Sequence, residues 1–135
     1  LIQLANHTEY MLYVIRDAQK RPLATVGTAV AADGTASQIA PAAIAIQSTG
    51  TWTSPHTGGV YPSGWQVVVA APNLSLTLTP DLLDQELVTA QSTGVAYWEG
   101  AVSIAGTAAG QTVSGEGYVE LTGYAALPAS TPAGL

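Results

Sequence analysis

Carboxylates and phenols gather at fixed offsets in the last third of the chain, where they could share one chemical task. Glu99, Glu116 and Glu120 stand in two segments that also hold Tyr97 and Tyr118. Both segments alternate polar and apolar residues, which is typical of strands with two different faces. A protonated carboxyl group beside a phenol can donate a proton to an apolar substrate. The chemistry that these residues suggest is acid-catalysed hydration or isomerisation of a carbon–carbon double bond.

The two segments predict one long β-hairpin. The loop 107–110 indicates that Gly106 pairs with Gln111. In this register the apolar pairs fall on one face of the hairpin and the polar pairs on the other. Trp98 lies on an apolar face, where glycines leave room for its ring or let another layer approach closely. A slip by one residue would mix the two faces, so the pattern itself supports this assignment of faces.

The polar face of the hairpin pairs Glu99 with Tyr118 and Tyr97 with Glu120. If this face lines a cavity, burial and like charge would raise the pKa of at least one carboxyl group, because no basic residue lies nearby in the sequence. Glu99, Tyr118 and Glu120 would then be the catalytic residues. Alternatively, the Glu and Tyr pairs lie on a solvated outer face, as is common in antiparallel sheets.

The composition excludes several classes of protein. A chain of 135 residues is long enough for one domain with its own core. Its net charge of −6 argues against a nucleic-acid partner, and the absence of cysteine excludes disulfides and thiolate metal sites. No apolar run approaches the roughly 20 residues of a membrane helix, so we expect no transmembrane segment. The chain begins in mid-pattern without an initiator Met, which indicates a piece of a longer protein.

Short strands separated by turn signals follow one another along the chain. The predicted strands are 9–14, 23–30, 44–47, 65–71 and 74–79, then a short strand after the turn 81–87, then the hairpin. Asp33-Gly34 is a strong turn signal, whereas 36–47 is ambiguous. The stretch 52–65 is rich in glycine, proline and hydroxyl residues and predicts the longest loop. Eight to nine strands with a turn signal at roughly every 8–12 residues are typical of an antiparallel barrel or sandwich.

Other residues with chemical potential are more isolated. His56 could act as a base or ligand, but the only other imidazole, His7, is far away in sequence, which favours an exposed loop histidine. Asp81, Asp84 and Glu86 could suggest a calcium site, but their spacing matches no known calcium loop, and turn or capping roles are favoured. The sequence therefore predicts neither a metal nor another cofactor.

Several segments together resemble the carotenoid 1,2-hydratase (hydroxyneurosporene synthase)/AttH-like family. In chain order they are Glu9–Asp17, Trp52–Pro55 with Thr57-Gly58, Tyr61-Pro62 and Trp65, then Asp84–Leu87, Tyr97–Gly100 and Gly117–Tyr124. The resemblance implies an all-β fold, an antiparallel lipocalin-like β-barrel over residues 1–126. It also implies that this barrel is the C-terminal half of a two-barrel protein, and we expect residues 127–135 to form a flexible tail.

The same resemblance implies that the barrel binds an apolar ligand of the lipid or isoprenoid class. The aromatic residues expected to contact this ligand are Tyr13, Trp65, Tyr97, Trp98 and Tyr124. The hydratase branch adds water across an isoprenoid double bond, so the alternative is a hydro-lyase or cyclase that acts by acid catalysis. Bacterial AttH-like members are often exported, which favours the periplasm or the cell envelope. The expected protein partner is the N-terminal half of the same protein or a second copy of the chain.

Two features separate the chain from the hydratase branch. The His- and Trp-containing motif of that branch belongs just upstream of this segment and is not in the chain. The branch is expected to carry an acidic Asp near the first strand, which here reads Tyr10-Met11-Leu12-Tyr13, with Asp17 only at its turn. Ligand binding is therefore our first hypothesis and acid catalysis the second. A third is a structural role, in which apolar surface left by a missing half drives dimerisation.

Overall fold

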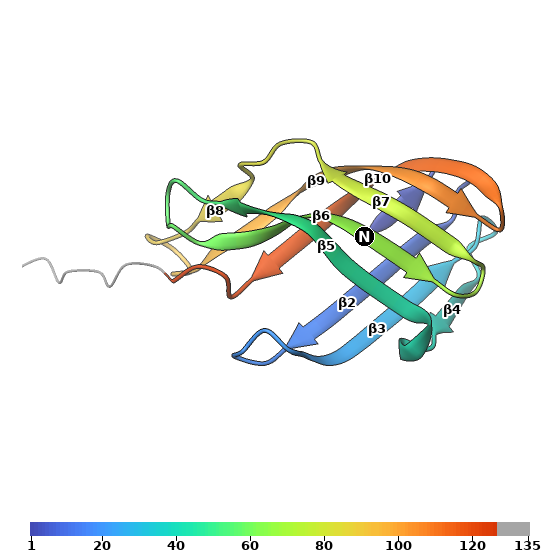
Figure 1. Cartoon of the computed structure of the whole chain (residues 1–135), viewed down its shortest axis with the longest axis horizontal. Helices are drawn as coiled ribbons and strands as arrows, with labels where there is room; N and C mark the ends of the chain where they lie inside the picture. Colours follow the sequence, from blue (N-terminus) through green and yellow to red (C-terminus); the bar gives the residue numbers. More distant parts are fainter. Residues whose placement is uncertain (127–135) are drawn as a thin grey trace, which may run out of the picture.

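A computed structural model describes residues 1–126, which form one curled antiparallel sheet (Figure 1). The strands are β1 (Ile2–Leu4), β2 (Glu9–Arg16), β3 (Pro22–Val30), β4 (Ala36–Ile39), β5 (Ile44–Thr53), β6 (Val60–Val69), β7 (Leu74–Pro80), β8 (Glu86–Val88), β9 (Ala96–Ala108) and β10 (Gln111–Thr122). A short 3₁₀ turn, η1 (Pro41–Ala43), joins β4 to β5. The predicted tail lies outside the described residues.

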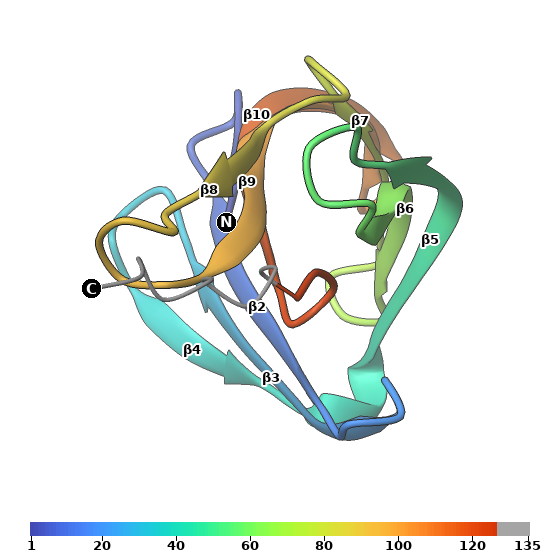
Figure 2. The same cartoon turned by 90° about the vertical axis from the view of Figure 1, so that its left-hand side faces the viewer.

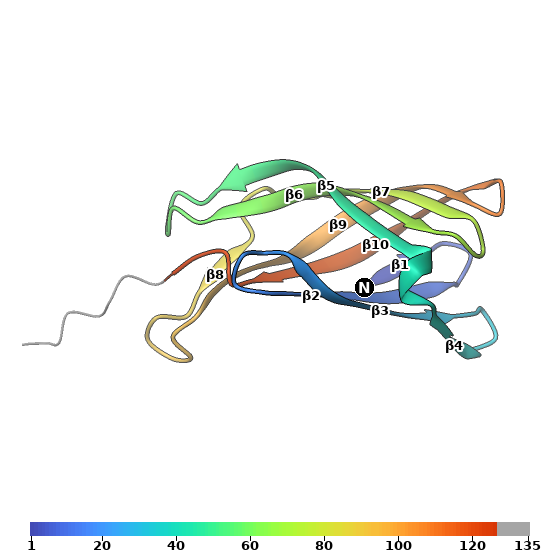
Figure 3. The ribbon, with the colours of Figure 1, turned by 60° about the horizontal axis from the view of Figure 1, so that its bottom comes forward.

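The strands lie side by side in the order β4-β3-β2-β1-β10-β9-β7-β6-β5, and β8 pairs with β9 beyond the end of β7. Figure 3 shows β5, β6 and β7 in one layer and β2, β3 and β4 in the other, with β9 and β10 joining the layers. The sheet thus curls into a half-barrel, as predicted for a lipocalin-like barrel. The described part has ten strands, slightly more than the eight to nine expected. None of its helical segments is long and apolar enough to cross a membrane.

Alternating apolar and polar residues in β7 give the sheet one buried face and one exposed face. Leu74, Leu76 and Leu78 are at most 4% exposed, whereas the Ser and Thr residues between them face outward. The same alternation in β6 and β9 adds Val67 and Val102 to the core. Because side chains alternate between the two faces of a strand, this pattern fixes which face of each strand is directed to the core.

The predicted loop at 52–65 is wrong in extent. Only residues 54–59 connect the strands, because β5 runs to Thr53 and β6 begins at Val60. Pro62 is tolerated in β6 because this part of the strand pairs with β5 alone, while β7 pairs only with Trp65 and the residues after it. Strands β1 and β4 were not predicted: β1 is short, and β4 lies in the segment that the sequence left ambiguous.

The β9–β10 hairpin has the predicted faces but not the predicted register. Gln111 pairs with Ala108 rather than with Gly106, a shift of two residues. The turn consists of Ala109 and Gly110 alone, both with positive φ (48° and 79°), as in the tight turns that match strand twist. Because the shift is even, every side chain stays on its predicted face.

The interior glycines of this hairpin permit close approach, one of the two roles predicted for them. A Cβ atom added to Gly100 would lie 2.2 Å from the side-chain amide carbon of Gln85. Gln85 also exchanges hydrogen bonds with the backbone of Ala101, its Oε1 accepting from the amide and its Nε2 donating to the carbonyl. A side chain at position 100 would therefore displace the segment between β7 and β8 from β9.

Candidate functional site

The interior of the half-barrel contains a cavity of about 1130 Å³. Its walls include strands on both sides of β1. In the described residues β1 pairs with β2 as far as Ile2–Tyr10 and with β10 as far as Ile2–Gly117. Met11–Arg16 of β2 and Tyr118–Thr122 of β10, which continue past these pairs, both border the cavity.

The walls of the cavity are mainly apolar. Ile46, Trp65, Val67 and Leu78 contribute from β5, β6 and β7; Leu12 and Val14 from β2; and Val119 and Leu121 from β10. Trp65 is 6% exposed, and its ring centre lies 6.0 Å from that of Trp98, which is 2% exposed. Sites for small molecules are commonly concave, largely apolar and about 300–1,000 Å³ in volume, so this cavity is large enough for a lipid-sized ligand.

The segment after β10 closes one end of the barrel. Figure 2, which looks into the barrel from that end, shows this segment (red) turning inward among the strands. The ring centre of Tyr124 lies 5.7 Å from that of fully buried Tyr61, which in turn lies 6.0 Å from that of Trp52. Lys20 Nζ lies 4.4 Å from the centre of the Tyr124 ring and donates to the carbonyl of Gly123, so a cation–π contact holds the segment from the other side.

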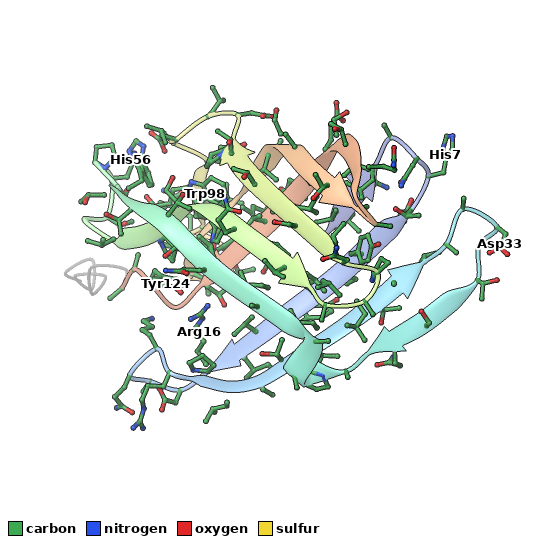
Figure 4. All side chains as sticks on the ribbon, turned by 45° about the vertical axis from the view of Figure 1, so that its right-hand side comes forward. His7, Arg16, Asp33, His56, Trp98 and Tyr124 are labelled. Atoms are coloured by element: carbon green, nitrogen blue, oxygen red, sulfur yellow. The ribbon has the colours of Figure 1, made fainter. Side chains whose placement is uncertain are left out.

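Charged side chains line the same end of the cavity. Arg16, Asp17 and Lys20 all border it, and the nearby Arg21 donates to Asp17 from its side chain at 2.7 Å. Backbone and side-chain hydrogen bonds from Arg21 lower the pKa of Asp17 below its usual value, so this carboxylate is ionised and paired at neutral pH. In Figure 4, Arg16 rises from the end of β2 toward the segment that carries Tyr124.

The carboxylate of Glu86 accepts hydrogen bonds from three side chains at this end of the barrel. Glu86 of β8 accepts hydrogen bonds from Tyr61 Oη at 2.8 Å, from Thr57 Oγ1 at 2.6 Å and from the buried Ser54 Oγ. Burial by itself raises the pKa of Glu86, but these three donors and the charge of nearby His56 outweigh burial and lower it. Burial and the hydrogen bond to Glu86 raise the pKa of Tyr61. Glu86 is thus an ionised structural acceptor rather than a proton donor near neutral pH.

The other acidic residues of the segment 81–86 have separate partners. Asp81 accepts from Ser103 at 2.6 Å, and Asp84 Oδ2 lies 2.8 Å from His56 Nε2. His56 is an exposed loop residue, as predicted, but the sequence did not reveal its acidic partner. Because these carboxylates point to different partners, they do not form the calcium site considered above. Within residues 1–126 no group of three His, Asp or Glu side chains is placed to hold a metal ion.

The residues predicted to be catalytic lie on the outer face of the hairpin. Glu99 pairs with Glu120 in the observed register, and Tyr118 is 44% exposed. Partial burial and the charge of Glu99 raise the pKa of Tyr118, and Tyr97 and Glu120 have smaller effects in the same direction. Of these residues, Tyr118 and Glu120 border the opening of the cavity, whereas Glu99 does not. The structure thus favours the solvated-face interpretation over a face directed into the barrel.

Three of the five aromatic residues predicted to contact a ligand border the cavity: Trp65, Tyr124 and Tyr13, the last of which is 54% exposed on the outward face of β2. Trp98 lies one layer deeper, packed on Trp65, and its indole N–H donates to the Leu83 carbonyl at 2.8 Å. Tyr97 lies on the outer face of β9. The sequence analysis missed Glu86, Tyr61 and Arg16. All three stand in segments that carried the family resemblance, and Glu86 was assigned only a turn or capping role.

Comparisons with known proteins agree with this architecture. A family model described as AttH-like matches residues 1–124. A crystal structure of an AttH protein from Nitrosomonas europaea is 32% identical, with a TM-score of 0.77 over 91% of this chain and 37% of that chain. Kievitone hydratase from Nectria haematococca is 20% identical, with a TM-score of 0.72 over 93% of this chain and 38% of its own, which shows a common fold. No curated protein matches the chain.

The chain spans less than two fifths of the length of each of these two structures. The family match, in contrast, extends from β1 to Tyr124 and so includes every strand and the segment that closes the barrel. The chain belongs to the AttH-like family.

Proposed function

We propose that this chain binds an apolar small molecule of the lipid or isoprenoid class in the cavity of the half-barrel. The observation that carries this proposal is the size and apolar lining of the cavity. Burial of apolar ligand surface is worth roughly 25 cal/mol per Å², so a long hydrocarbon chain in such a cavity gains enough free energy for micromolar binding or better.

The test is an equilibrium titration of the complete natural protein with a fluorescent polyene probe. We expect saturable binding with one probe per chain and competition by unlabelled lipids. Energy transfer from tryptophan to the polyene that falls in Trp65→Phe would place the probe near Trp65, because this ring borders the cavity. If no polyene, fatty-acid or isoprenoid probe binds saturably, the proposal is wrong.

A second candidate is a hydratase-type reaction at the rim of the same cavity. Tyr118 and Glu120 border the opening, and the chain shares its fold with a protein described as a hydratase. In such a reaction a protonated carboxyl group donates its proton to one alkene carbon, and water adds to the resulting cation at the other carbon. The water then returns a proton to the carboxylate, which restores the acid.

The catalytic candidate is tested by Glu120→Gln and Glu99→Gln in the complete protein. Loss of turnover with unchanged ligand binding would support acid catalysis, because the amide keeps the shape of the side chain but cannot donate the required proton. Unchanged turnover would remove the substituted residue from the mechanism. Glu116→Gln on the same strand is a control, because Glu116 is exposed and does not border the cavity.

An exposed apolar row on β2 supports a protein partner, which we propose is the remainder of a longer polypeptide or a second copy of the chain. Met11, Tyr13 and Ile15 alternate along the outward face of β2 and are 38%, 54% and 56% exposed, and Val26 of β3 lies opposite Tyr13. Sedimentation of the complete protein with and without Tyr13→Ser tests for a second copy. A concentration-dependent dimer that this substitution weakens would support one, whereas a monomer at every concentration would leave only the intramolecular partner.

A further inference from the structure

The positive charges of this chain are concentrated at one end of the cavity. All three basic residues of the sequence, Arg16, Lys20 and Arg21, fall within or just after the last residues of β2, in a chain of net charge −6. Arg21 is paired with Asp17 at 2.7 Å, and Lys20 is placed over the ring of Tyr124. Arg16 borders the cavity and has no carboxylate within ion-pair distance in the part of the chain that the structure describes.

The carboxylates near this end do not compensate Arg16. Asp17 is engaged by the side chain and the backbone amide of Arg21. Glu120 also borders the cavity, but it lies on the outer face of β10, opposite Glu99. The cationic side chains that border the cavity are therefore Arg16 and Lys20, next to walls that are mainly apolar.

An uncompensated guanidinium at the end of an apolar cavity matches one type of ligand. The planar guanidinium binds a carboxylate through two parallel hydrogen bonds, which a neutral alcohol or a hydrocarbon cannot form. The cavity borders β2 from Met11 to Arg16, and a rise of about 3.3 Å per residue makes this wall about 17 Å long. This length suits an extended hydrocarbon tail whose polar end reaches Arg16.

We propose that the ligand of this cavity is an anionic amphiphile, with its carboxylate held by Arg16 and its apolar tail along the apolar walls of the cavity. The proposal rests on the function proposed above and adds the chemical class of the ligand. Lys20 contributes a second positive charge near the carboxylate without leaving its place over Tyr124. The carboxylate would in turn neutralise the only cation in the described part of the cavity that is not otherwise engaged.

The test compares two probes that differ only at the polar end, tetradecanoate and tetradecan-1-ol, each displacing the same fluorescent polyene from the complete natural protein. At neutral pH and low salt we expect the carboxylate to bind about tenfold more tightly than the alcohol, since hydrogen bonds to charged groups are among the stronger ones. Added salt should reduce this ratio, because Arg16 is exposed to solvent.

Variants assign the preference to Arg16. Arg16→Gln should abolish the preference for the carboxylate, measured as the ratio of the two affinities within the variant, and Arg16→Lys should restore part of this ratio. Gln111→Glu is the matched control: it changes the net charge by the same amount at an exposed residue of the β9–β10 hairpin, at the opposite end of the barrel. This control should keep the preference.

The possible outcomes separate the two proposals. Equal binding of acid and alcohol by the natural protein, or a preference that survives Arg16→Gln, would overturn the assignment of an anionic ligand while leaving apolar binding in place. A polyene that binds but is displaced by neither probe would likewise overturn the anionic amphiphile, whereas the absence of saturable binding by any polyene, fatty-acid or isoprenoid probe would overturn the proposed function itself. Circular dichroism of each variant distinguishes a lost contact from a lost fold.

Discussion

The hydroxyl of Tyr61 donates to Glu86 at 2.8 Å and so ties β6 to β8, two strands that do not pair with each other. Thr57 and Ser54 donate to the same carboxylate from the β5–β6 connection. On its other side the Tyr61 ring packs on Tyr124, which borders the cavity. Glu86 therefore supports the closed end of the barrel through one buried phenol.

This arrangement predicts that Glu86 contributes to stability. Glu86→Gln should lower the free energy of unfolding by about 1–3 kcal/mol, because a neutral amide replaces an ionised acceptor and its NH₂ group faces three donors. Tyr61→Phe should cost about 1 kcal/mol, since two of the three donors remain. Urea unfolding measures both. Glu116→Gln, at an exposed position of β10, is the control and should change the free energy of unfolding by less than about 0.5 kcal/mol. An equally small effect at Glu86 would contradict a structural role for the cluster.

The lowered pKa of Glu86 also predicts how stability depends on pH. Above its usual value of 4.5, Glu86 is ionised in both the folded and the unfolded chain, and its hydrogen bonds contribute fully. As the pH falls below this value, the unfolded chain takes up the proton first, so stability decreases until the folded-state pKa is passed. Asp17 and Asp33 also have lowered pKa values and act in the same direction.

Urea unfolding in steps from neutral pH to about pH 3 measures this loss of stability. The natural protein should lose more stability over this range than Glu86→Gln does, and the difference between the two should shrink toward low pH. Parallel curves for the two proteins would mean that the folded state does not favour the ionised form of Glu86.

The β9–β10 turn offers a substitution that should stabilise the chain. Ala109 has a φ of 48°, a conformation that costs an L-residue about 1–2 kcal/mol and that Asn adopts more readily. Ala109→Asn should therefore raise the free energy of unfolding by a few tenths to about 1 kcal/mol, whereas Gly110→Ala should lower it by about 1–2 kcal/mol. Ala105→Asn on the exposed face of β9 is the control and should destabilise, because Asn is unfavourable in strands. If Ala109→Asn also destabilises, the tight turn and its register are wrong.

The same hairpin shows what could be predicted from the sequence. Alternation in β9 and β10 set the two faces correctly, because a side chain's face depends only on whether its position is odd or even. The register depended on the turn, and Ala109 gives little sign that it adopts positive φ. The loop predicted at 52–65 was too long for a related reason: Pro62 and Gly64 lie in β6, in the part of the strand that pairs with β5 alone.

The candidate site could be predicted less well, because it depends on contacts between segments far apart in sequence. Glu86 and Tyr61 are 25 positions apart, and nothing in the local pattern of either indicates a shared hydrogen bond. Arg16 stands in a segment that carried the family resemblance, but no local pattern marks it as a cavity residue, and its place there follows from the packing of β2 in the barrel. Trp65 and Tyr124, which were predicted as ligand contacts, border the cavity, and their contact with a ligand stays a prediction.

The most direct test of the central proposal places the same large side chain on the two faces of one strand. Ile46 of β5 borders the cavity, whereas its neighbour Ala45 is exposed on the opposite face. We expect Ile46→Trp to fill part of the cavity and to weaken binding of the polyene probe by at least about tenfold, while Ala45→Trp leaves the dissociation constant unchanged. If both variants bind as the natural protein does, or lose binding equally while both remain folded, the ligand does not occupy this cavity.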